Sequence, residues 1–292
     1  TEGRDPRKQE KSNAFCFQLT QVMKEFKRYE DVPDRREPFT VGMLLALHEE
    51  VDGVPTANID PALLDWFVIG IHAGLRRGEW AQDRNNYNTN KPELNIKGDP
   101  QAFQLRDFKF KGTTRRFISH EEVLKNPHKA VAVELCWRTQ KNQENGAKKL
   151  FARNDKDKRL CPVTHAINII SRFDKLCGLN DKTTPIAVYR HEDHNDVRSI
   201  TSADIELTMR SIAIKYYELD PVNDVEDIMK FSAHSLRVGA CVILQSMGFA
   251  THQIQQILRW KSDSWMMYTR NLMTMAKKQN EALLEASIVP VV

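Results

Sequence analysis

Residues 62–73, ALLDWFVIGIHA, constrain the fold more than any other stretch of this sequence. Drawn as a helix, the segment is apolar on nearly every side, and such a helix must be surrounded by other elements. We expect Asp60 to cap it, with Pro61 in the first turn, where a missing N–H costs nothing, and Gly74 to end or bend it. The segment is interrupted by Asp65 and falls short of the roughly 20 apolar residues of a membrane span. The sequence therefore predicts a globular protein with a buried central helix and no membrane partner.

Helical periodicity recurs on both sides of this segment. Apolar residues at helical spacing predict helices over residues 12–30, 40–51, 163–177 and 203–217. We expect Thr40 to cap the second of these, and Thr201 with Asp204 to form a variant capping box at the start of the last. Gly178 should stop the third helix.

The chain from Ser235 onward is also expected to be helical, with a break near Gly248. Thr251 is expected to cap a short helix that ends near Trp260. A last helix should then start at residue 262 or 263 and carry Tyr268.

The period changes between residues 85 and 154. Segments 103–110, 115–119 and 131–137 alternate in polarity or are rich in β-forming residues, and NQENG at 142–146 is a good turn. These features predict a small antiparallel sheet. The expected fold class is therefore mainly α with a small antiparallel β-sheet, an α+β fold.

Prolines and charged residues crowd the stretch 31–38, DVPDRREP, which is typical of a linker or a domain boundary. We therefore expect residues 1–33 to be the last helix of another domain, whose start is missing, plus a linker. Residues 34–292 are expected to form a second domain with a helical C-terminal tail.

Charge and cysteine content narrow the function only slightly. The formal net charge is +4, which favours nucleic-acid binding weakly, although basic residues do occur in pairs. The 5 cysteines have neither CxxC nor zinc-finger spacing, so we expect free thiols and no metal site.

One set of residues carries recognisable chemistry. His234 and Arg237 lie one helical turn apart and can face the same site, and Trp260 and Tyr268 follow them. Far upstream, Arg76 stands in GLRRGEW at the end of the central helix. Together these side chains provide a phosphate clamp, a proton-handling imidazole and a phenol nucleophile.

In these motifs the sequence resembles the tyrosine recombinase (phage integrase) family. It carries GLRRGE at 74–79, HSLR at 234–237, LRW at 258–260 and YTR at 268–270, in the family's order, and the resemblance covers about residues 35–285. The tryptophan in place of the commoner histidine and the RWKSD segment are most similar to recombinases of eukaryotic mobile elements.

The resemblance implies a role for each residue. Tyr268 would attack the scissile phosphate and form a 3′-phosphotyrosyl bond. The guanidinium groups of Arg76 and Arg237 would hold the non-bridging oxygens. His234 would handle the tyrosine proton or position the phosphate, and Trp260 would brace the phosphate through its indole N–H. Glu79 would orient Arg76 or stabilise its turn. The mechanism implies no cofactor, metal or ATP.

The family also uses a lysine on a β-hairpin to protonate the leaving oxygen. Lys141 is the first candidate, and Lys148 and Lys149, just across the predicted turn, compete with it. Contacts to the DNA backbone are expected from the following basic residues: Arg35, Arg36, Arg77, Lys148 and Lys149.

The implied partner is double-stranded DNA, bound by a homotetramer with one dimer per site. Residues 1–33 would then belong to an N-terminal DNA-binding domain and residues 34–292 to the catalytic domain. The location would be the nucleus in a eukaryote, or the cytoplasm or nucleoid in a prokaryote. Two alternatives stay open: an inactive DNA-binding protein derived from a mobile element, and an enzyme that nicks and reseals DNA as type IB topoisomerases do.

Overall fold

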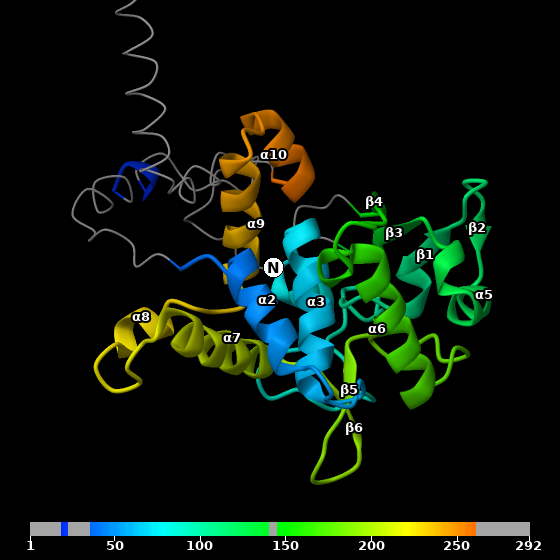
Figure 1. Ribbon diagram of the computed structural model, residues 1–292, viewed down its shortest axis with the longest axis horizontal. Coiled ribbons are helices and arrows are strands. Elements are labelled where there is room, and N and C mark those ends of the chain that lie inside the picture. The colour runs from blue at the N-terminus through cyan, green and yellow to red at the C-terminus, as the bar shows by residue number, and fades with distance from the viewer. Residues whose placement is uncertain (1–18, 23–35, 140–144, 261–292) are drawn as a thin grey trace, which may run out of the picture. The chain divides into compact units, whose positions relative to one another are not determined.

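The computed structural model describes residues 19–22, 36–139 and 145–260 (Figure 1). The chain divides into a unit of residues 1–35 and a unit of residues 36–292. In the first unit, residues 19–22 are helical, and the rest of the helix expected over 12–30 lies outside the described residues. The expected linker before Arg36, the turn at 142–144 and the last helix also lie outside them.

Helix α3, Ile59–Ala73, lies in the middle of the helices of the second unit (Figure 1). Of its 15 residues 11 are buried, as the apolar sequence predicts. Helices α2 (Val41–Glu50), α6 (Pro162–Leu176), α7 (Ser202–Tyr217) and α9 (Ser235–Ser246) pack around it. The predicted central helix is therefore confirmed.

The start of α3 differs from the prediction. The capping position belongs to Asn58, the last residue with extended backbone before the helix, and no side chain caps it by a hydrogen bond. Asp60 is already helical, and its carboxylate accepts a hydrogen bond from Thr208 Oγ1 at 3.4 Å. At the other end, Gly74 adopts the left-handed conformation (φ 58°) and stops the helix as expected.

Most other predicted helix boundaries hold. Thr40 Oγ1 accepts the N–H of Met43 at 3.2 Å at the start of α2. Thr201 and Asp204 form the expected capping box of α7. The cap of α10 (Thr251–Leu258) is Ala250 instead of Thr251, because Ala250 is the last extended residue and Thr251 is the first helical one.

Several short elements have no counterpart in the sequence-based expectations. They are α4 (Arg77–Trp80), α5 (His120–Lys125), α8 (Val225–Met229) and three 3-10 turns at Leu105–Asp107, Pro127–Lys129 and Lys158–Leu160. A two-stranded ribbon of β5 (Val188–Arg190) and β6 (Val197–Ser199) was also not predicted. Such short pieces carry too few residues to show a period.

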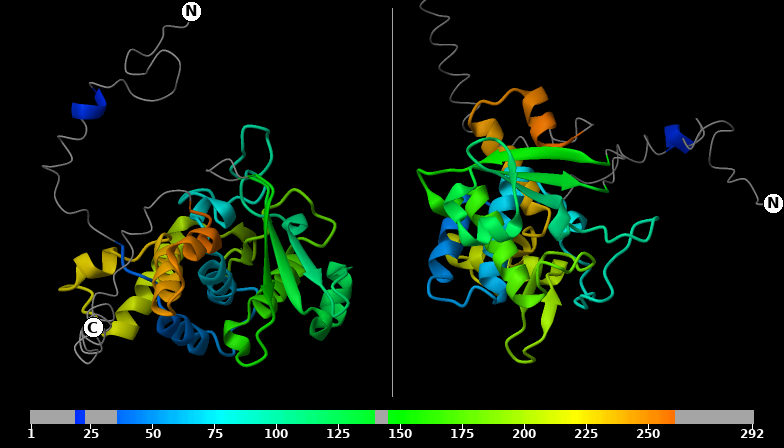
Figure 2. Two further views of the ribbon diagram at one scale, coloured as in Figure 1. Left: turned by 90° about the horizontal axis from the view of Figure 1, so that it is seen from above. Right: turned by 90° about the vertical axis from the view of Figure 1, so that its right-hand side faces the viewer.

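The predicted antiparallel sheet is present and lies to one side of the helices (Figures 1 and 2). Its strands are β1 (Phe108–Lys111), β2 (Phe117–Ile118), β3 (Ala132–Trp137) and β4 (Ala147–Ala152), in the order β2-β1-β3-β4. The segment predicted from residue 103 is a strand only from Phe108, because residues 105–107 form a 3-10 turn. The fold is thus helix-rich with a small antiparallel sheet, which confirms the α+β class.

An aromatic cluster joins the sheet to the central helix. Trp66 of α3 stacks on Trp80 at 5.1 Å between ring centroids, and Phe103 contacts both Trp66 and Trp137. These rings are buried. Through Trp80 and Trp137 they hold the end of α4 close to the end of β3, where the candidate site described below lies.

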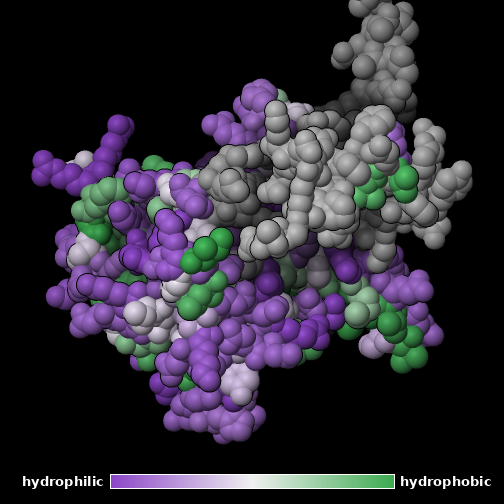
Figure 3. Space-filling model, turned by 180° about the vertical axis from the view of Figure 1, so that it is seen from behind, coloured by the Kyte–Doolittle hydropathy of each residue, from purple (hydrophilic) through white to green (hydrophobic). Residues whose placement is uncertain are grey.

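The described surface is ordinary for a globular protein. The face seen in Figure 3 is mainly hydrophilic, with separate hydrophobic patches. Among the described residues, no helix combines the length and the apolar character that a membrane crossing requires.

Candidate active site

The turn after α3 places the first arginine. Gly74 reverses the chain in a left-handed conformation that favours glycine, and a Cβ there would lie 2.6 Å from Leu258 Cδ2, so a larger residue would also push that side chain aside. Arg76 follows with extended backbone as the residue that starts α4. Its side chain is partly exposed, so its guanidinium is held at the protein surface next to the end of α3.

Glu79 is the carboxylate that holds this turn together. Its Oε2 accepts the backbone N–H of Arg76 at 3.0 Å, and its Oε1 lies 3.0 Å from Arg76 Nη1. Trp137 Nε1, at the end of β3, donates to Oε2 at 3.1 Å. Glu79 therefore contacts both the backbone and the guanidinium of Arg76 directly.

A third arginine, which the sequence motifs did not single out, completes the shell of Glu79. Arg259 places Nη2 3.0 Å from Oε2 and Nη1 3.3 Å from Oε1. Burial alone would raise the pKa of Glu79, but the charge and hydrogen bonds of Arg259, with those of Arg76, outweigh it and hold this pKa below its ordinary value. Glu79 is thus ionised wherever the protein is folded at neutral pH.

Helix α9 brings the second predicted arginine to the same place. Arg237 is buried, and its Nη1 donates to the Gly74 carbonyl at 2.6 Å. Its guanidinium carbon lies 4.7 Å from the ring centroid of Trp260, which is also buried. The Gly74 carbonyl at the end of α3 therefore anchors Arg237, and Arg237 in turn packs against Trp260.

His234 lies at the start of α9, one turn before Arg237, and its side chain remains accessible. The pKa of His234 is lowered below its ordinary value. The main cause is partial burial of the ring, and the positive charges of Arg237, Arg36 and Arg76 add to it. The imidazole is thus mainly neutral at pH 7 and can accept a proton.

The sheet register separates the two hairpin lysines of the described chain. Lys149 lies opposite the buried Leu135 and so shares the inner face of the sheet, whereas Lys148 lies opposite Cys136 on the outer face. Lys149 Nζ donates to the Gln256 carbonyl of α10 at 2.8 Å. Burial, then the charges of Arg259 and Arg237, lowers the pKa of Lys149 to about 8.

The predicted DNA contacts behave differently from one another. Arg36 is exposed, donates to the Met229 carbonyl at 2.8 Å and is close enough to His234 to influence it. Arg77 is engaged elsewhere: its Nη1 lies 3.1 Å from Glu93 and 3.4 Å from Asp83.

Three expected residues lie outside the described chain: Arg35, Lys141 and Tyr268. The structure thus brings together Arg76, Glu79, His234, Arg237 and Trp260 with Lys149, one of the competing hairpin lysines, and it adds Arg259. Cations outnumber the single carboxylate among these side chains. Such a cluster attracts a phosphate and offers a neutral base beside it.

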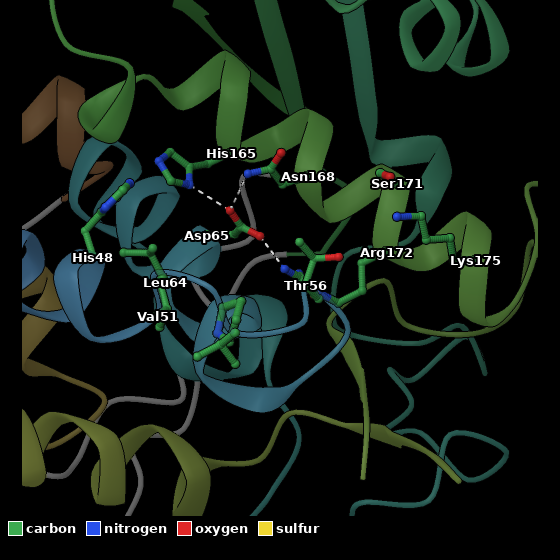
Figure 4. Close-up of a pocket in the computed structure, with 12 residues that line it drawn as sticks. His48, Val51, Thr56, Leu64, Asp65, His165, Asn168, Ser171, Arg172 and Lys175 are labelled. Carbon is green, nitrogen blue, oxygen red and sulfur yellow. Dashed lines mark hydrogen bonds and ion pairs between the residues drawn. The ribbon is translucent and has the colours of Figure 1, made fainter. Parts of the chain in front are cut away.

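A second polar cluster lines a pocket of about 210 Å³ between α3 and α6 (Figure 4). Asp65 points into it and is bonded to His165 Nδ1 at 2.7 Å, to Asn168 Nδ2 at 3.0 Å and to Arg172. Arg172 also donates to the Thr56 carbonyl. Every polar partner of Asp65 comes from the fold itself, so we assign this cluster to the packing of α3 on α6.

No protein-family model matches this chain, and no curated protein matches it. Among solved structures, the chain is similar to the Tn1549 transposon integrase in complex with transposon right end DNA. The identity is 13% and the TM-score 0.41, over 94% of this chain and 72% of that chain. A structure of the same integrase with a circular intermediate DNA gives 12% identity and a TM-score of 0.37, over 92% and 72% of the two chains.

Proposed function

We propose that this protein cleaves and rejoins DNA through a 3′-phosphotyrosyl intermediate, as a site-specific recombinase or integrase. One observation carries the proposal. Arg76, His234, Arg237 and Trp260, which are far apart in the sequence, meet at the C-terminal end of α3 in the order and types that the resemblance implies.

The two arginines would bind the non-bridging oxygens of the scissile phosphate. Guanidinium stays charged and presents a planar fork of donors, which matches phosphate geometry. Arg76 is held by Glu79, and Arg237 is held by the Gly74 carbonyl. Donors that are fixed before the reaction stabilise the charge that develops on these oxygens in the transition state.

The proton transfers follow from the remaining groups. The phenol oxygen of Tyr268 forms a bond to phosphorus, and the bond from phosphorus to the 5′-oxygen breaks. His234, neutral at pH 7 because of its lowered pKa, takes the phenol proton. A lysine gives a proton to the departing 5′-oxygen, and strand joining reverses these steps.

Two lysines compete for the role of proton donor. The sequence favours Lys141, which follows the predicted strand 131–137. Lys149 gains support because it faces the site from the inner side of the sheet and bonds to α10, the helix that precedes Trp260. Lys148 is on the outer face and is the natural control.

The substrate of this proposal is double-stranded DNA, gripped mainly through phosphates. Arg36, beside His234, would extend the positive surface of the site. The same proposal includes a homotetramer with one dimer per site and, in a eukaryotic host, a nuclear location. It assigns residues 1–33 to a DNA-binding domain and residues 34–292 to the catalytic domain.

The proposal is tested by trapping the intermediate. Incubation with nicked DNA that carries a candidate site should yield a covalent protein–DNA adduct, because the cleaved fragment diffuses away and prevents rejoining. Tyr268→Phe should abolish the adduct, and Tyr216→Phe, on the exposed side of α7, should preserve it. An adduct that survives Tyr268→Phe, or wild-type protein that forms none, would contradict the proposal.

The same assay separates the alternatives. Wild-type protein that binds DNA without forming an adduct would be an inactive DNA-binding protein. An adduct followed by resealing of the same strand only, without joining of two duplexes, would indicate a topoisomerase-like enzyme. Exchange of strands between duplexes is the result that we expect.

The proton donor is identified with a substrate whose 5′-bridging oxygen is replaced by sulfur. A thiolate leaves without a proton, so the variant that lacks the proton donor should be slow on normal DNA and near normal on the sulfur substrate. We expect this rescue for either Lys141→Met or Lys149→Met. Lys148→Met should cleave both substrates at similar rates, and rescue of that variant would contradict the face assignment.

A further inference from the structure

Arg259 directly precedes Trp260, and its side chain is only 4% exposed. It ends α10 in the left-handed conformation, with φ 57°, which is uncommon for a residue other than glycine. Its guanidinium grips both oxygens of Glu79, donates to the Ala73 carbonyl at 3.3 Å and lies 3.8 Å from the ring centroid of Trp137. One side chain thus connects α3, α4, β3 and the end of α10.

Arg76 depends on Arg259 indirectly, through the carboxylate of Glu79 that both arginines contact. Glu79, which is 7% exposed, binds Arg76 through both its backbone N–H and its guanidinium. The remaining bonds of this carboxylate come from Arg259 and Trp137. Without Arg259, a buried carboxylate would keep only part of its compensation, and its charged form would be disfavoured.

We infer that Arg259 is a positioning residue: by clamping Glu79 it fixes Arg76 for phosphate binding and ties the Trp260 segment to the same point. This inference rests on the proposed function. Arg259 would then link Arg76 to the segment that leads from Trp260 to Tyr268. None of the motif residues fills this role.

Arginine is required here for geometric reasons. Its planar fork meets both oxygens of one carboxylate, and its flat face stacks on an indole ring, whereas lysine offers a single charged point. Lysine at this position would keep the charge but lose the second hydrogen bond and the stacking.

The pH profile distinguishes positioning from simple stabilisation. The charged groups that face Glu79 are Arg76 and Arg259, and those that face Lys149 are Arg237 and Arg259. Removal of the Arg259 charge raises the pKa of Glu79, so a higher pH is needed to regenerate the carboxylate that holds Arg76. It also raises the pKa of Lys149, so loss of that proton moves to higher pH.

The test compares Arg259→Gln, Arg259→Lys and a control, Arg84→Gln, in single-turnover cleavage of the nicked substrate from pH 5 to pH 9. Arg84 pairs with Glu206 on the surface and is 60% exposed. We expect Arg259→Gln to cleave about a hundredfold more slowly at pH 7, as for a misplaced catalytic group, with its acid limb shifted to higher pH. Arg259→Lys should be slow but keep the acid limb near that of wild type, and Arg84→Gln should match wild type.

A second readout is independent of activity. In protein labelled with ¹³C at glutamate carboxyls and without DNA, the Glu79 resonance should titrate at higher pH in Arg259→Gln than in wild type. If Arg259→Gln folds poorly, Arg259→Lys carries the test through its rate. An unshifted acid limb and an unshifted Glu79 titration in folded Arg259→Gln would overturn the inference. Absence of the adduct from wild type would instead overturn the proposed function.

Discussion

At the scale of single residues, Arg76 and Arg237, which both lie near the C-terminal end of α3, differ in how they are held. Arg237 is buried against Trp260 and anchored to the Gly74 carbonyl, whereas Arg76 is partly exposed and depends on Glu79. Both present a planar cation whose orientation is set by a neighbour. Charge alone therefore does not describe what these positions require.

Replacement of either arginine by lysine is expected to separate binding from chemistry. Arg76→Lys and Arg237→Lys keep the charge, so DNA affinity should fall only slightly. Each loses the fork that would stabilise the transition state under the proposed function, so single-turnover cleavage should slow by roughly a hundredfold or more. The measurement is adduct formation against affinity from gel shifts, and equal losses in both would argue that these arginines only bind DNA.

Lys149 is expected to show its lowered pKa directly. Amine labelling followed by mass spectrometry should find half-maximal reactivity of Lys149 near pH 8, well below the ordinary lysine value of 10.5. Since the neutral amine reacts, labelling should increase as the pH rises through 8. Bound DNA should suppress it, because phosphates favour the protonated form. Labelling of Lys149 that begins only above pH 10 would contradict the described environment.

At the scale of elements, the site depends on a close approach between α9 and the segment before α2. Phe39 donates its N–H to the Ser235 carbonyl at 3.0 Å, and a Cβ at Gly239 would lie 2.1 Å from the Phe39 carbonyl oxygen. A backbone atom cannot move aside as a side chain can. Gly239 therefore sets how near α9, with His234 and Arg237, can lie to the neighbouring chain.

Gly239→Ala is expected to destabilise the protein by about 1–3 kcal/mol, the usual cost of overpacking. The control is Gly78→Ala in α4, where a Cβ would meet nothing within 4 Å and the helix gains from alanine. Urea denaturation of both variants measures the difference. A Gly239→Ala protein as stable as wild type would show that α9 can shift without cost.

At the scale of the whole molecule, α3 is held against α6 by the buried Asp65 cluster (Figure 4). Burial raises the pKa of Asp65, but the Arg172 charge and the hydrogen bonds from His165 and Asn168 outweigh it and hold this pKa below 3.8. The carboxylate therefore contributes stability above the unfolded-state pKa, and this contribution is lost as the pH falls through the lower folded-state value.

Asp65→Asn is expected to lower the free energy of unfolding by about 3–5 kcal/mol at neutral pH, since it leaves the Arg172 charge buried without its partner. The difference from wild type should stay constant above about pH 5 and shrink in more acidic solution, below about pH 4. Denaturation series at several pH values measure it. Asp174→Asn, on the exposed side of α6, is the control, and an equal loss in both variants would contradict the assignment.

Several features of the fold followed from local sequence alone. The all-round apolar segment 62–73 predicted the buried α3, Gly74 and Gly178 predicted helix ends, and alternation predicted a small sheet. These signals are local because a cap, a stop or a period involves residues within one or two turns. The cap positions at Asn58 and Ala250 were missed, because neighbouring polar residues offered equally good caps.

For the candidate site, the sequence by itself determined the chemical types and their order: Arg76 with Glu79, then His234 with Arg237, then Trp260. Their roles, and that of Tyr268, stay predictions. The tertiary structure alone decided that Arg259 clamps Glu79 and that Lys149, and not Lys148, faces the arginines. The reason is physical: both facts depend on long-range packing and strand register, which bring together atoms more than 100 positions apart in the chain.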